Sequence, residues 1–98
     1  LAALIAITAD GCEIVDNVLK ACAEDGIDVE SGDACFIDGN LVIGCVGEGI
    51  ENNGTNTTLT NNVMKKNRVD LANDGTLDDV TNNQFTTGGT NEVPLIDF

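Results

Sequence analysis

A chain of 98 residues is enough for one domain, and residues 1–98 are treated as a single unit. Acidic residues outnumber basic residues by 17 to 4, and the resulting net charge of −13 argues against binding to nucleic acids or anionic membranes. The chain has no His, Tyr or Trp, so catalytic machinery is scarce and we predict that the protein is not an enzyme.

Residues 1–9 are almost entirely apolar. The segment is much shorter than the roughly 20 residues that cross a bilayer, so no membrane span is expected. Two structures fit it: an upstream extension of a helix, or an Ile-rich strand over residues 4–8. Either structure exposes apolar surface, which predicts docking to a neighbouring subunit.

A helix is predicted over residues 10–26. Asp10 is suited to cap it, Glu13 follows at the capping-box spacing, and Gly26 ends the segment. The apolar residues in between recur at helical spacing, and they are Ile14, Val15, Val18, Leu19 and Cys22. This amphipathic helix needs a partner to cover its apolar stripe.

A β-hairpin over residues 35–45 is the expected partner. Turn-forming residues 38–40 (Asp-Gly-Asn) separate two apolar segments that can pair across the turn. Alternation then places one set of residues on the face that covers the helix: Cys35, Ile37, Leu41, Ile43 and Cys45. Between helix and hairpin, Ile27 and Val29 alternate with acidic residues and predict a short strand.

The four cysteines all lie in residues 10–46, and their even number favours disulfides and an extracellular, oxidising compartment. On a helix, Cys12 and Cys22 stand about 15 Å apart, too far for a disulfide. We therefore favour Cys12–Cys45 with Cys22–Cys35, and the alternative is Cys12–Cys35 with Cys22–Cys45. Without His or a Cys-x-x-Cys spacing, neither a zinc site nor a catalytic cysteine is expected.

Residues 47–98 are rich in Asn and Thr and contain an approximate repeat. Residues 59–64 match residues 80–85, and residues 38–43 echo both at a spacing of 21. The repeat aligns apolar residues and asparagines separately: Ile43 with Met64 and Phe85, and Asn40 with Asn61 and Asn82. In these residues the chain resembles a right-handed parallel β-helix. The competing layout is an antiparallel meander with strands near Met64, 68–71, Val80 and 92–98.

Two motifs in this half suggest surface chemistry. Asn53 and Asn56 each begin an Asn-x-Thr triplet and are candidates for glycosylation. Residues 70–81 resemble the calcium loops of dockerin and EF-hand modules, with the ligand positions filled by Asp70, Asp74, Thr76 and Asp78. Two ligand positions are lost, so the resemblance implies weak calcium binding at best, and no other cofactor is expected. The alternative is an Asx turn.

The fold class predicted is α+β. It consists of an N-terminal amphipathic helix disulfide-linked to a small, mostly antiparallel β-sheet (residues 10–46), followed by an Asn/Thr-rich β second half (residues 47–98). The alternative is a short parallel β-helix with an N-terminal helical cap.

The function predicted is a secreted or cell-surface structural protein, a self-assembling subunit of a pilus-like filament or coat. The alternative is a small extracellular binding or adhesion module with a weak calcium loop. The expected partner is another copy of the chain. The expected interface joins the two apolar ends through Leu1, Leu4, Ile5, Ile7, Val93, Leu95, Ile96 and Phe98.

Overall fold

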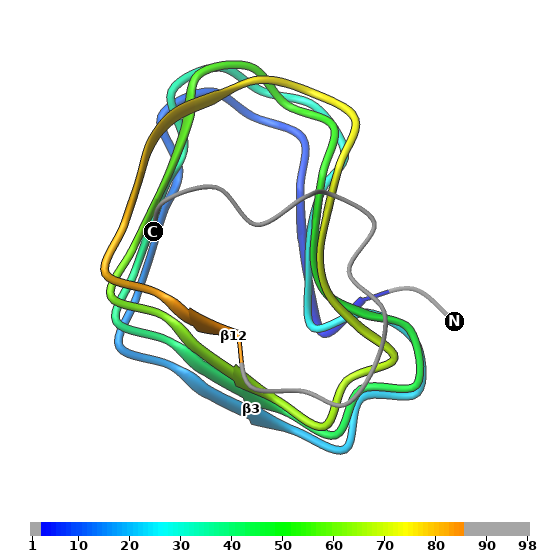
Figure 1. The fold of residues 1–98 in the computed structure, drawn as a ribbon. Coiled ribbons are helices and arrows are strands. Elements are labelled where there is room, and N and C mark those ends of the chain that lie inside the picture. Colours follow the sequence, from blue (N-terminus) through cyan, green and yellow to red (C-terminus); the bar gives the residue numbers. More distant parts are fainter. Residues whose placement is uncertain (1–2, 86–98) are drawn as a thin grey trace.

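The fold is a parallel β-solenoid. A computed structural model describes residues 3–85, which form twelve short strands and no helix. Viewed along its axis, the chain winds repeatedly around the same three-sided outline (Figure 1). Each coil contributes one strand to each of three four-stranded sheets, and every strand pairs in parallel with the equivalent strand of the next coil.

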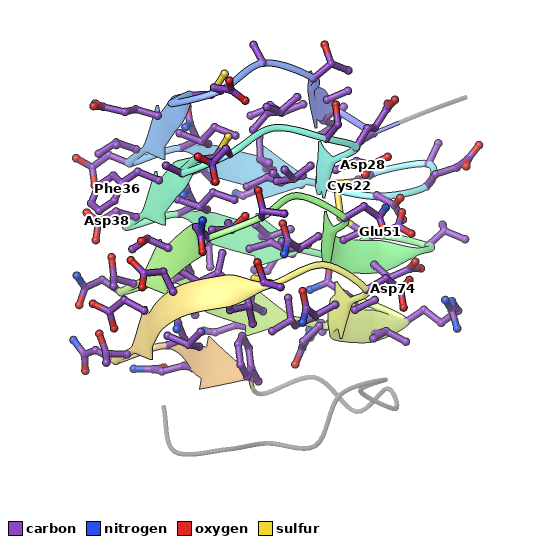
Figure 2. The ribbon with its side chains drawn as sticks, turned by 90° about the horizontal axis from the view of Figure 1, so that it is seen from above. Cys22, Asp28, Phe36, Asp38, Glu51 and Asp74 are labelled. Carbon is purple, nitrogen blue, oxygen red and sulfur yellow. A yellow bond between two sulfur atoms is a disulfide. The ribbon has the colours of Figure 1, made fainter. Side chains whose placement is uncertain are left out.

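Sheet A contains β1 (Ile5–Ile7), β4 (Ile27–Val29), β7 (Glu48–Asn52) and β10 (Val69–Asn73). Sheet B contains β2 (Glu13–Val15), β5 (Phe36–Asp38), β8 (Thr57–Thr60) and β11 (Leu77–Thr81). Sheet C contains β3 (Val18–Lys20), β6 (Leu41–Ile43), β9 (Val63–Lys65) and β12 (Gln84–Phe85). From the side, the coils lie as layers in chain order (Figure 2).

Left-handed residues make the corners between the sheets. At the corner between sheets B and C, this position is filled in turn by Asp16, Gly39, Asn61 and Asn82, all with φ between 57° and 72°. The other two corners use Gly11, Ala34 and Asn56, and Ala21, Gly44 and Lys66. Gly and Asn tolerate this conformation better than most residues, which explains part of the Asn and Gly content.

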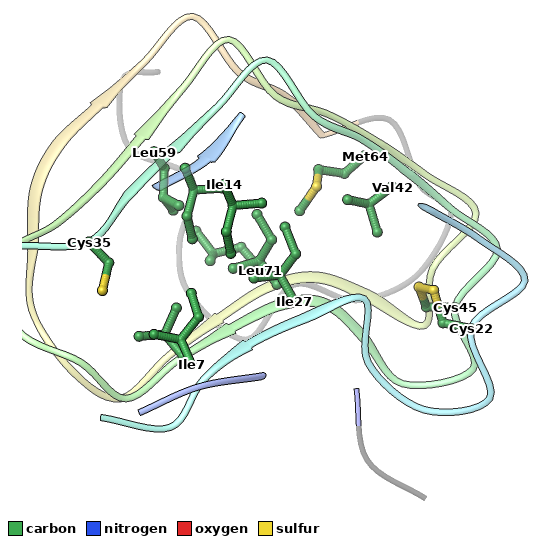
Figure 3. Close-up of a cluster of buried hydrophobic side chains, with 13 residues drawn as sticks. Ile7, Ile14, Cys22, Ile27, Cys35, Val42, Cys45, Leu59, Met64 and Leu71 are labelled. Atoms are coloured by element: carbon green, nitrogen blue, oxygen red, sulfur yellow. A yellow bond between two sulfur atoms is a disulfide. The ribbon is translucent and has the colours of Figure 1, made fainter. Parts of the chain in front are cut away.

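The core lies inside the coils, where apolar side chains of successive layers stack on one another (Figure 3). Ile14 pairs with Ile37, which pairs with Leu59. In sheet A, Ile27 is in register with Ile50 and Ile50 with Leu71. Because each strand is only 2 to 5 residues long, most strands contribute one or two inward side chains, and Cys22, Cys35 and Cys45 add to the core from the corners.

An internal asparagine ladder replaces apolar contacts at one corner. The Asn40 side chain contacts Asn62, and Asn62 contacts Asn83, through hydrogen bonds of 3.0 Å and 3.1 Å. Each amide also serves the backbone, since Asn62 Nδ2 donates to the carbonyl of Ile37 at 3.0 Å. These buried polar groups are therefore satisfied coil by coil.

The predicted α+β fold is wrong. The segment expected to be a helix contains β2 and β3, and between them Asp16 turns the chain with φ of 57°. Ile14 points into the core, whereas Val15 and Val18 are exposed. The apparent helical period arose because short strands on either side of a corner place apolar residues at irregular spacing.

The predicted hairpin is also wrong. β5 and β6 flank Gly39, but they belong to different sheets and pair with neighbouring coils in parallel. The meander fails for the same reason, and its last strand lies outside the described residues. The parallel β-helix expected as the alternative has an N-terminal helical cap, and the structure differs from it there, since residues 3–85 contain no helix. The short strands expected within residues 4–8 and at Ile27 and Val29 correspond to β1 and β4.

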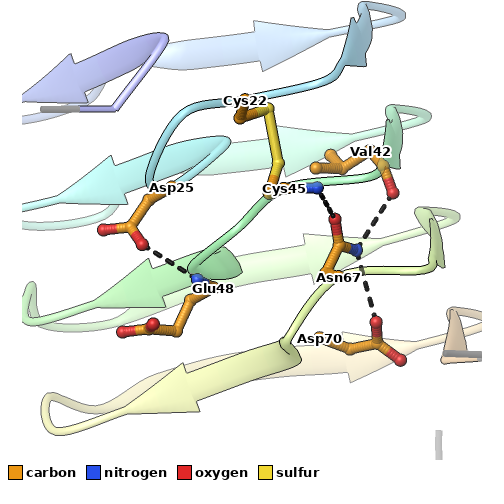
Figure 4. The surroundings of a disulfide bond; sticks show 7 residues. All are labelled: Cys22, Asp25, Val42, Cys45, Glu48, Asn67 and Asp70. Atoms are coloured by element: carbon orange, nitrogen blue, oxygen red, sulfur yellow. Dashed lines mark hydrogen bonds between the residues drawn. A yellow bond between two sulfur atoms is a disulfide. The ribbon is translucent and has the colours of Figure 1, made fainter. Parts of the chain in front are cut away.

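The favoured disulfide pairing differs from the structure, which joins Cys22 to Cys45 (Figure 4). Cys12 and Cys35 are free thiols. A helix would favour Cys12–Cys45, whereas a parallel register brings together residues one coil apart, and Cys22 and Cys45 are separated by 23 residues. In residues 3–85, no helix is long and apolar enough to cross a membrane.

Candidate functional site

Three carboxylates converge on the outer side of sheet A. Asp25 lies in the turn before β4, Asp28 lies in β4 and Glu51 lies in β7. Each offers one oxygen, and these oxygens lie within 4.8 Å of one another. Figure 2 shows Asp28 and Glu51 on successive coils at the same side of the molecule. We call these three residues the acidic triad.

The register of sheet A creates this convergence. Ile27 and Val29 point into the core, so Asp28 between them faces outward. Ile50 and Asn52 are likewise buried on either side of Glu51. Asp28 and Glu51 are direct partners across parallel strands. Like charges directly opposite one another in a sheet are destabilising, so packing alone does not explain this pair.

The backbone holds the third member in place. Asp25 Oδ1 accepts a hydrogen bond from the Glu48 amide at 2.9 Å (Figure 4). That bond links the turn before β4 to the first residue of β7. The side chain of Glu48 is directed to another partner, because its Oε2 forms an ion pair with Arg68 at 2.7 Å. The triad is therefore a fixed feature of two adjacent coils.

The electrostatics show that the triad resists full ionisation. The pKa of Glu51 is raised to about 7, by burial first and then by Asp25, Asp28 and Glu48. The pKa of Asp28 is also raised, with burial again the largest cause, followed by Glu30, Asp25 and Glu48. A cation among the three oxygens would oppose these effects by favouring the ionised carboxylates.

One carboxylate oxygen of the triad residues lacks a hydrogen-bond partner among residues 3–85. Asp28 Oδ1 is buried and has no hydrogen-bond partner within the part of the chain that the structure describes. Leaving a buried acceptor unpaired costs roughly 1–3 kcal/mol. An ion or water molecule is the usual partner for such an atom. The arrangement can thus hold a small cation through two or three oxygens.

The predicted calcium loop has a different structure. Asp70 is buried in β10 and accepts a hydrogen bond from Asn67 at 3.3 Å. Asp74 lies in the turn, and Asp78 lies in β11. Among residues 3–85, the carboxylates that converge are those of the triad, and none comes from this loop. The Thr76 carbonyl accepts a hydrogen bond from the Thr57 amide at 3.1 Å.

The remaining predicted residues are scattered. Asn53 and Asn56 are exposed at the corner between sheets A and B, and Asn56 Nδ2 donates to Asp33 at 2.9 Å. Their glycosylation stays a prediction. In the expected interface, Leu4 is exposed, Ile5 is half-buried and Ile7 is in the core. The other expected interface residues lie outside the described residues: Leu1, Val93, Leu95, Ile96 and Phe98.

Sequence reasoning missed the triad because Glu51 is distant in the chain from Asp25 and Asp28. The signal that would have found it is the coil length. Asp28 and Glu51 are separated by the same 23 residues as the bonded cysteines Cys22 and Cys45. Once that spacing is known, two carboxylates one coil apart must be neighbours on the same face.

Comparison with known proteins identified one family. Residues 2–97 match the family model described as "Periplasmic copper-binding protein (NosD)". No curated protein and no solved structure matched this chain. The family's periplasmic description agrees with the expected location outside the cytoplasm, and the disulfide agrees with an oxidising compartment.

Proposed function

The chain belongs to this family, and we propose that it is a non-enzymatic β-solenoid of the periplasmic or extracellular space that binds a divalent cation, copper(II) above all, at the acidic triad. The observation that carries the proposal is the convergence of three carboxylate oxygens within 4.8 Å from two coils. The family's description supports the choice of copper, and the convergence of the carboxylates supports the choice of the triad.

The donor atoms suit copper(II) better than copper(I). The triad offers only carboxylate oxygens, and the free thiols of Cys12 and Cys35 are not part of it. Soft sulfur ligands select copper(I), whereas oxygen ligands hold divalent ions. For a given set of such ligands, affinity among first-row divalent metals peaks at copper. Asp25, Asp28 and Glu51 would hold the ion, and its charge would remove the repulsion between them.

Proton competition sets the conditions under which binding is tightest. Because the pKa of Glu51 is raised to about 7, a proton occupies this carboxyl over much of the acidic range. A metal ion must displace that proton. Affinity is therefore expected to rise as pH increases from about 5 to 8 and then to level off.

The direct test is a calorimetric titration of metal-free protein with copper(II) at pH 7.5. A Cys12→Ser/Cys35→Ser background prevents free thiols from reducing the ion. We expect one equivalent to bind, and we expect Asp28→Asn and Glu51→Gln to weaken binding by at least about tenfold, since each removes a charged ligand. Calcium is titrated in parallel and is expected to bind more weakly.

The matched control is Asp79→Asn, which removes an exposed carboxylate from sheet B and leaves the triad intact. It is expected to bind copper(II) as the background protein does. Equal affinities in all of the variants would mean that copper(II) binds elsewhere, and the proposal would then fail.

A second candidate function is end-to-end self-assembly, and the first coil favours it. β1, β2 and β3 each stand at the end of their sheets. Among the described residues, no strand pairs with their outer edges. Exposed apolar side chains accompany this edge, namely Leu4, Val15 and Val18. A parallel coil of a second copy can continue all three sheets there.

Val18 and Val46 form a matched pair for testing assembly. Val18 lies on the first coil and is 60% exposed. Val46 lies in the corner between β6 and β7 and is 69% exposed. In sedimentation over a concentration series, Val18→Lys is expected to reduce association, and Val46→Lys is expected to leave it unchanged. A wild-type chain that stays monomeric at the highest concentration rules out this function.

A further inference from the structure

The two free cysteines occupy equivalent positions on adjacent coils. Glu13 pairs with Phe36 in sheet B, so the preceding residues, Cys12 and Cys35, are also opposite one another. The Phe36 amide donates to the Cys12 carbonyl at 2.8 Å, which fixes this register. Their separation along the chain equals that of the bonded pair Cys22–Cys45, which is 23 residues.

The thiols themselves meet at one backbone atom. Cys12 Sγ donates to the Ala9 carbonyl at 3.5 Å, and Cys35 Sγ donates to the same oxygen at 3.4 Å. Adjacent parallel strands lie about 4.8 Å apart, and disulfides need Cα atoms within roughly 4.4–6.8 Å. A bond between these sulfur atoms therefore requires side-chain rotation and no change of register.

The two sulfur pairs differ in accessibility. Cys22 and Cys45 are both buried, at 1% and 3% exposure. In the other pair, Cys35 is buried at 1% exposure, whereas Cys12 is only half-buried. A reagent from solvent can thus reach Cys12 but not its partner. Burial also raises the pKa of the Cys35 thiol above its ordinary value, which makes it a poor first nucleophile.

We propose that Cys12 and Cys35 are a redox-active dithiol, in which Cys12 exchanges with disulfide-bearing oxidants and Cys35 resolves the product. The Cys12 thiolate attacks one sulfur of the oxidant, its S–S bond breaks, and one thiol leaves. The Cys35 thiolate then attacks Cys12 Sγ and releases the second thiol. The protein loses two electrons and two protons, and the oxidant disulfide becomes two thiols.

This inference is independent of the copper proposal, since the dithiol shares no residue with the acidic triad. A Cys12–Cys35 disulfide would join the first coil to the second at the corner between sheets A and B. The Cys22–Cys45 disulfide lies at a different corner, between sheets C and A. The first coil would then be held at two points instead of one, and thiol reductants would reverse the change. Cys22–Cys45 is expected to remain closed throughout, because neither sulfur is accessible.

The test is a redox titration of the wild-type chain in glutathione buffers of increasing oxidised fraction. Free thiols are quenched by alkylation, and the chain is cleaved at Asp residues before mass analysis. Asp16, Asp25 and Asp38 separate the four cysteines onto different peptides. The expected result is a Cys12–Cys35 crosslink that forms and reverses with the buffer, while Cys22–Cys45 stays linked.

Single variants assign the roles. Cys35→Ser is expected to accumulate glutathione on Cys12, and Cys12→Ser is expected to leave Cys35 unmodified. Circular dichroism verifies that both variants fold. The wild-type titration needs no variant, and thiols that stay fully alkylatable in the most oxidising buffer would overturn the proposal. Equal modification of the two variants would overturn the assigned order of attack.

Discussion

Glu51 shows how one residue can carry a cost that a ligand would remove. Its pKa is raised to about 7 by burial and by the neighbouring carboxylates. The folded chain therefore keeps a proton that the unfolded chain releases above about pH 4.5. Stability associated with this group is present at low pH and is lost as pH rises through about 7.

The first prediction follows from that sign. The unfolding free energy of metal-free protein should fall by on the order of 1 kcal/mol between pH 5 and pH 8, since Glu51 is partly solvated and its shift is discounted accordingly. Glu51→Gln should remove most of this dependence. Urea denaturation at the two pH values measures it.

The matched variant is Glu13→Gln, which removes one exposed negative charge from sheet B. It should retain the wild-type dependence. If Glu51→Gln shows the same fall in stability as wild type, the raised pKa is not a property of the folded protein in solution.

Gly26 provides the second prediction, because the coil stack leaves it no room. A Cβ atom at Gly26 would lie 2.6 Å from Val42 Cγ1 and 2.7 Å from the Gly49 carbonyl oxygen. Gly26→Ala should therefore cost about 1–3 kcal/mol as an overpacked site. At Gly11 a Cβ atom meets nothing within 4 Å, and only its φ of 65° opposes a side chain. In urea denaturation, Gly11→Ala should cost less than Gly26→Ala, and the reverse order would contradict the coil packing.

At the scale of elements, the asparagine ladder is the feature most specific to this fold. Asn62 Oδ1 accepts from both the amide and the side chain of Asn40, each at 3.0 Å. Its own side chain donates to Ile37 and Asn83. Removing Asn62 would leave buried groups unpaired on both neighbouring coils.

The third prediction is that Asn62→Ala lowers the unfolding free energy by about 2–4 kcal/mol, since more than one buried partner is left unsatisfied. Asn17 stands at the end of the ladder, is half-buried, and bonds to Asn40 on one neighbouring coil and to the Val15 carbonyl of its own coil. Asn17→Ala should cost about 1 kcal/mol. Thermal or urea unfolding compares the two, and equal losses would mean that the ladder is not the source of the stability.

The ladder also explains what could and could not be predicted from sequence. The repeat was visible in residues 59–64 and 80–85, and Leu59 does pair with Val80 and Met64 with Phe85. Extending a period of 21 toward the N-terminus failed because the coils lengthen. The ladder spacings are 23, 22 and 21 residues along the chain. Asn40 therefore stacks on Asn62, not on Asn61. In the same way, Met64 is in register with Val42, not with Ile43.

The same change of spacing concealed the N-terminal coil. With three-residue strands, β2 and β3 each show too few alternations for a strand pattern. The corner residue Asp16 lies between them and looks like an ordinary polar position of a helix. Every strand pair in this solenoid joins residues 20 or more positions apart, so local periodicity carries little information about the pairing.

For the whole molecule, the disulfide sets how firmly the first coil is attached. Cys22 follows β3 on the first coil, and Cys45 follows β6 on the second coil. The disulfide therefore joins equivalent corners of adjacent coils. A loop of 23 residues predicts about 3 kcal/mol of stabilisation through the unfolded state. The fourth prediction is that Cys22→Ala/Cys45→Ala loses roughly this amount in urea denaturation.

Val46→Ala is the control for the disulfide, because Val46 follows Cys45 and is exposed at the same corner. It should change stability by less than about 0.5 kcal/mol. A double cysteine variant as stable as wild type would show that the first coil is held by strand pairing alone.

The location of the whole molecule outside the cytoplasm was more predictable than its site. The even cysteine count indicated a protein outside the cytoplasm, which the family's periplasmic description supports. The acidic triad could not be predicted, because a carboxylate cluster built from two coils exists only once their register is known. Calcium binding by residues 70–81 stays a prediction; Asp70 and Asp78 lie in β10 and β11, which belong to different sheets.

The measurement closest to the central claim is the copper X-ray absorption spectrum of the Cys12→Ser/Cys35→Ser protein loaded with one equivalent of copper(II). Ligation by Asp25, Asp28 and Glu51 predicts a shell made only of oxygen atoms, and this shell should be lost in Glu51→Gln. A shell containing sulfur, or a spectrum that Glu51→Gln leaves unchanged, would contradict the assignment of the acidic triad as the metal site.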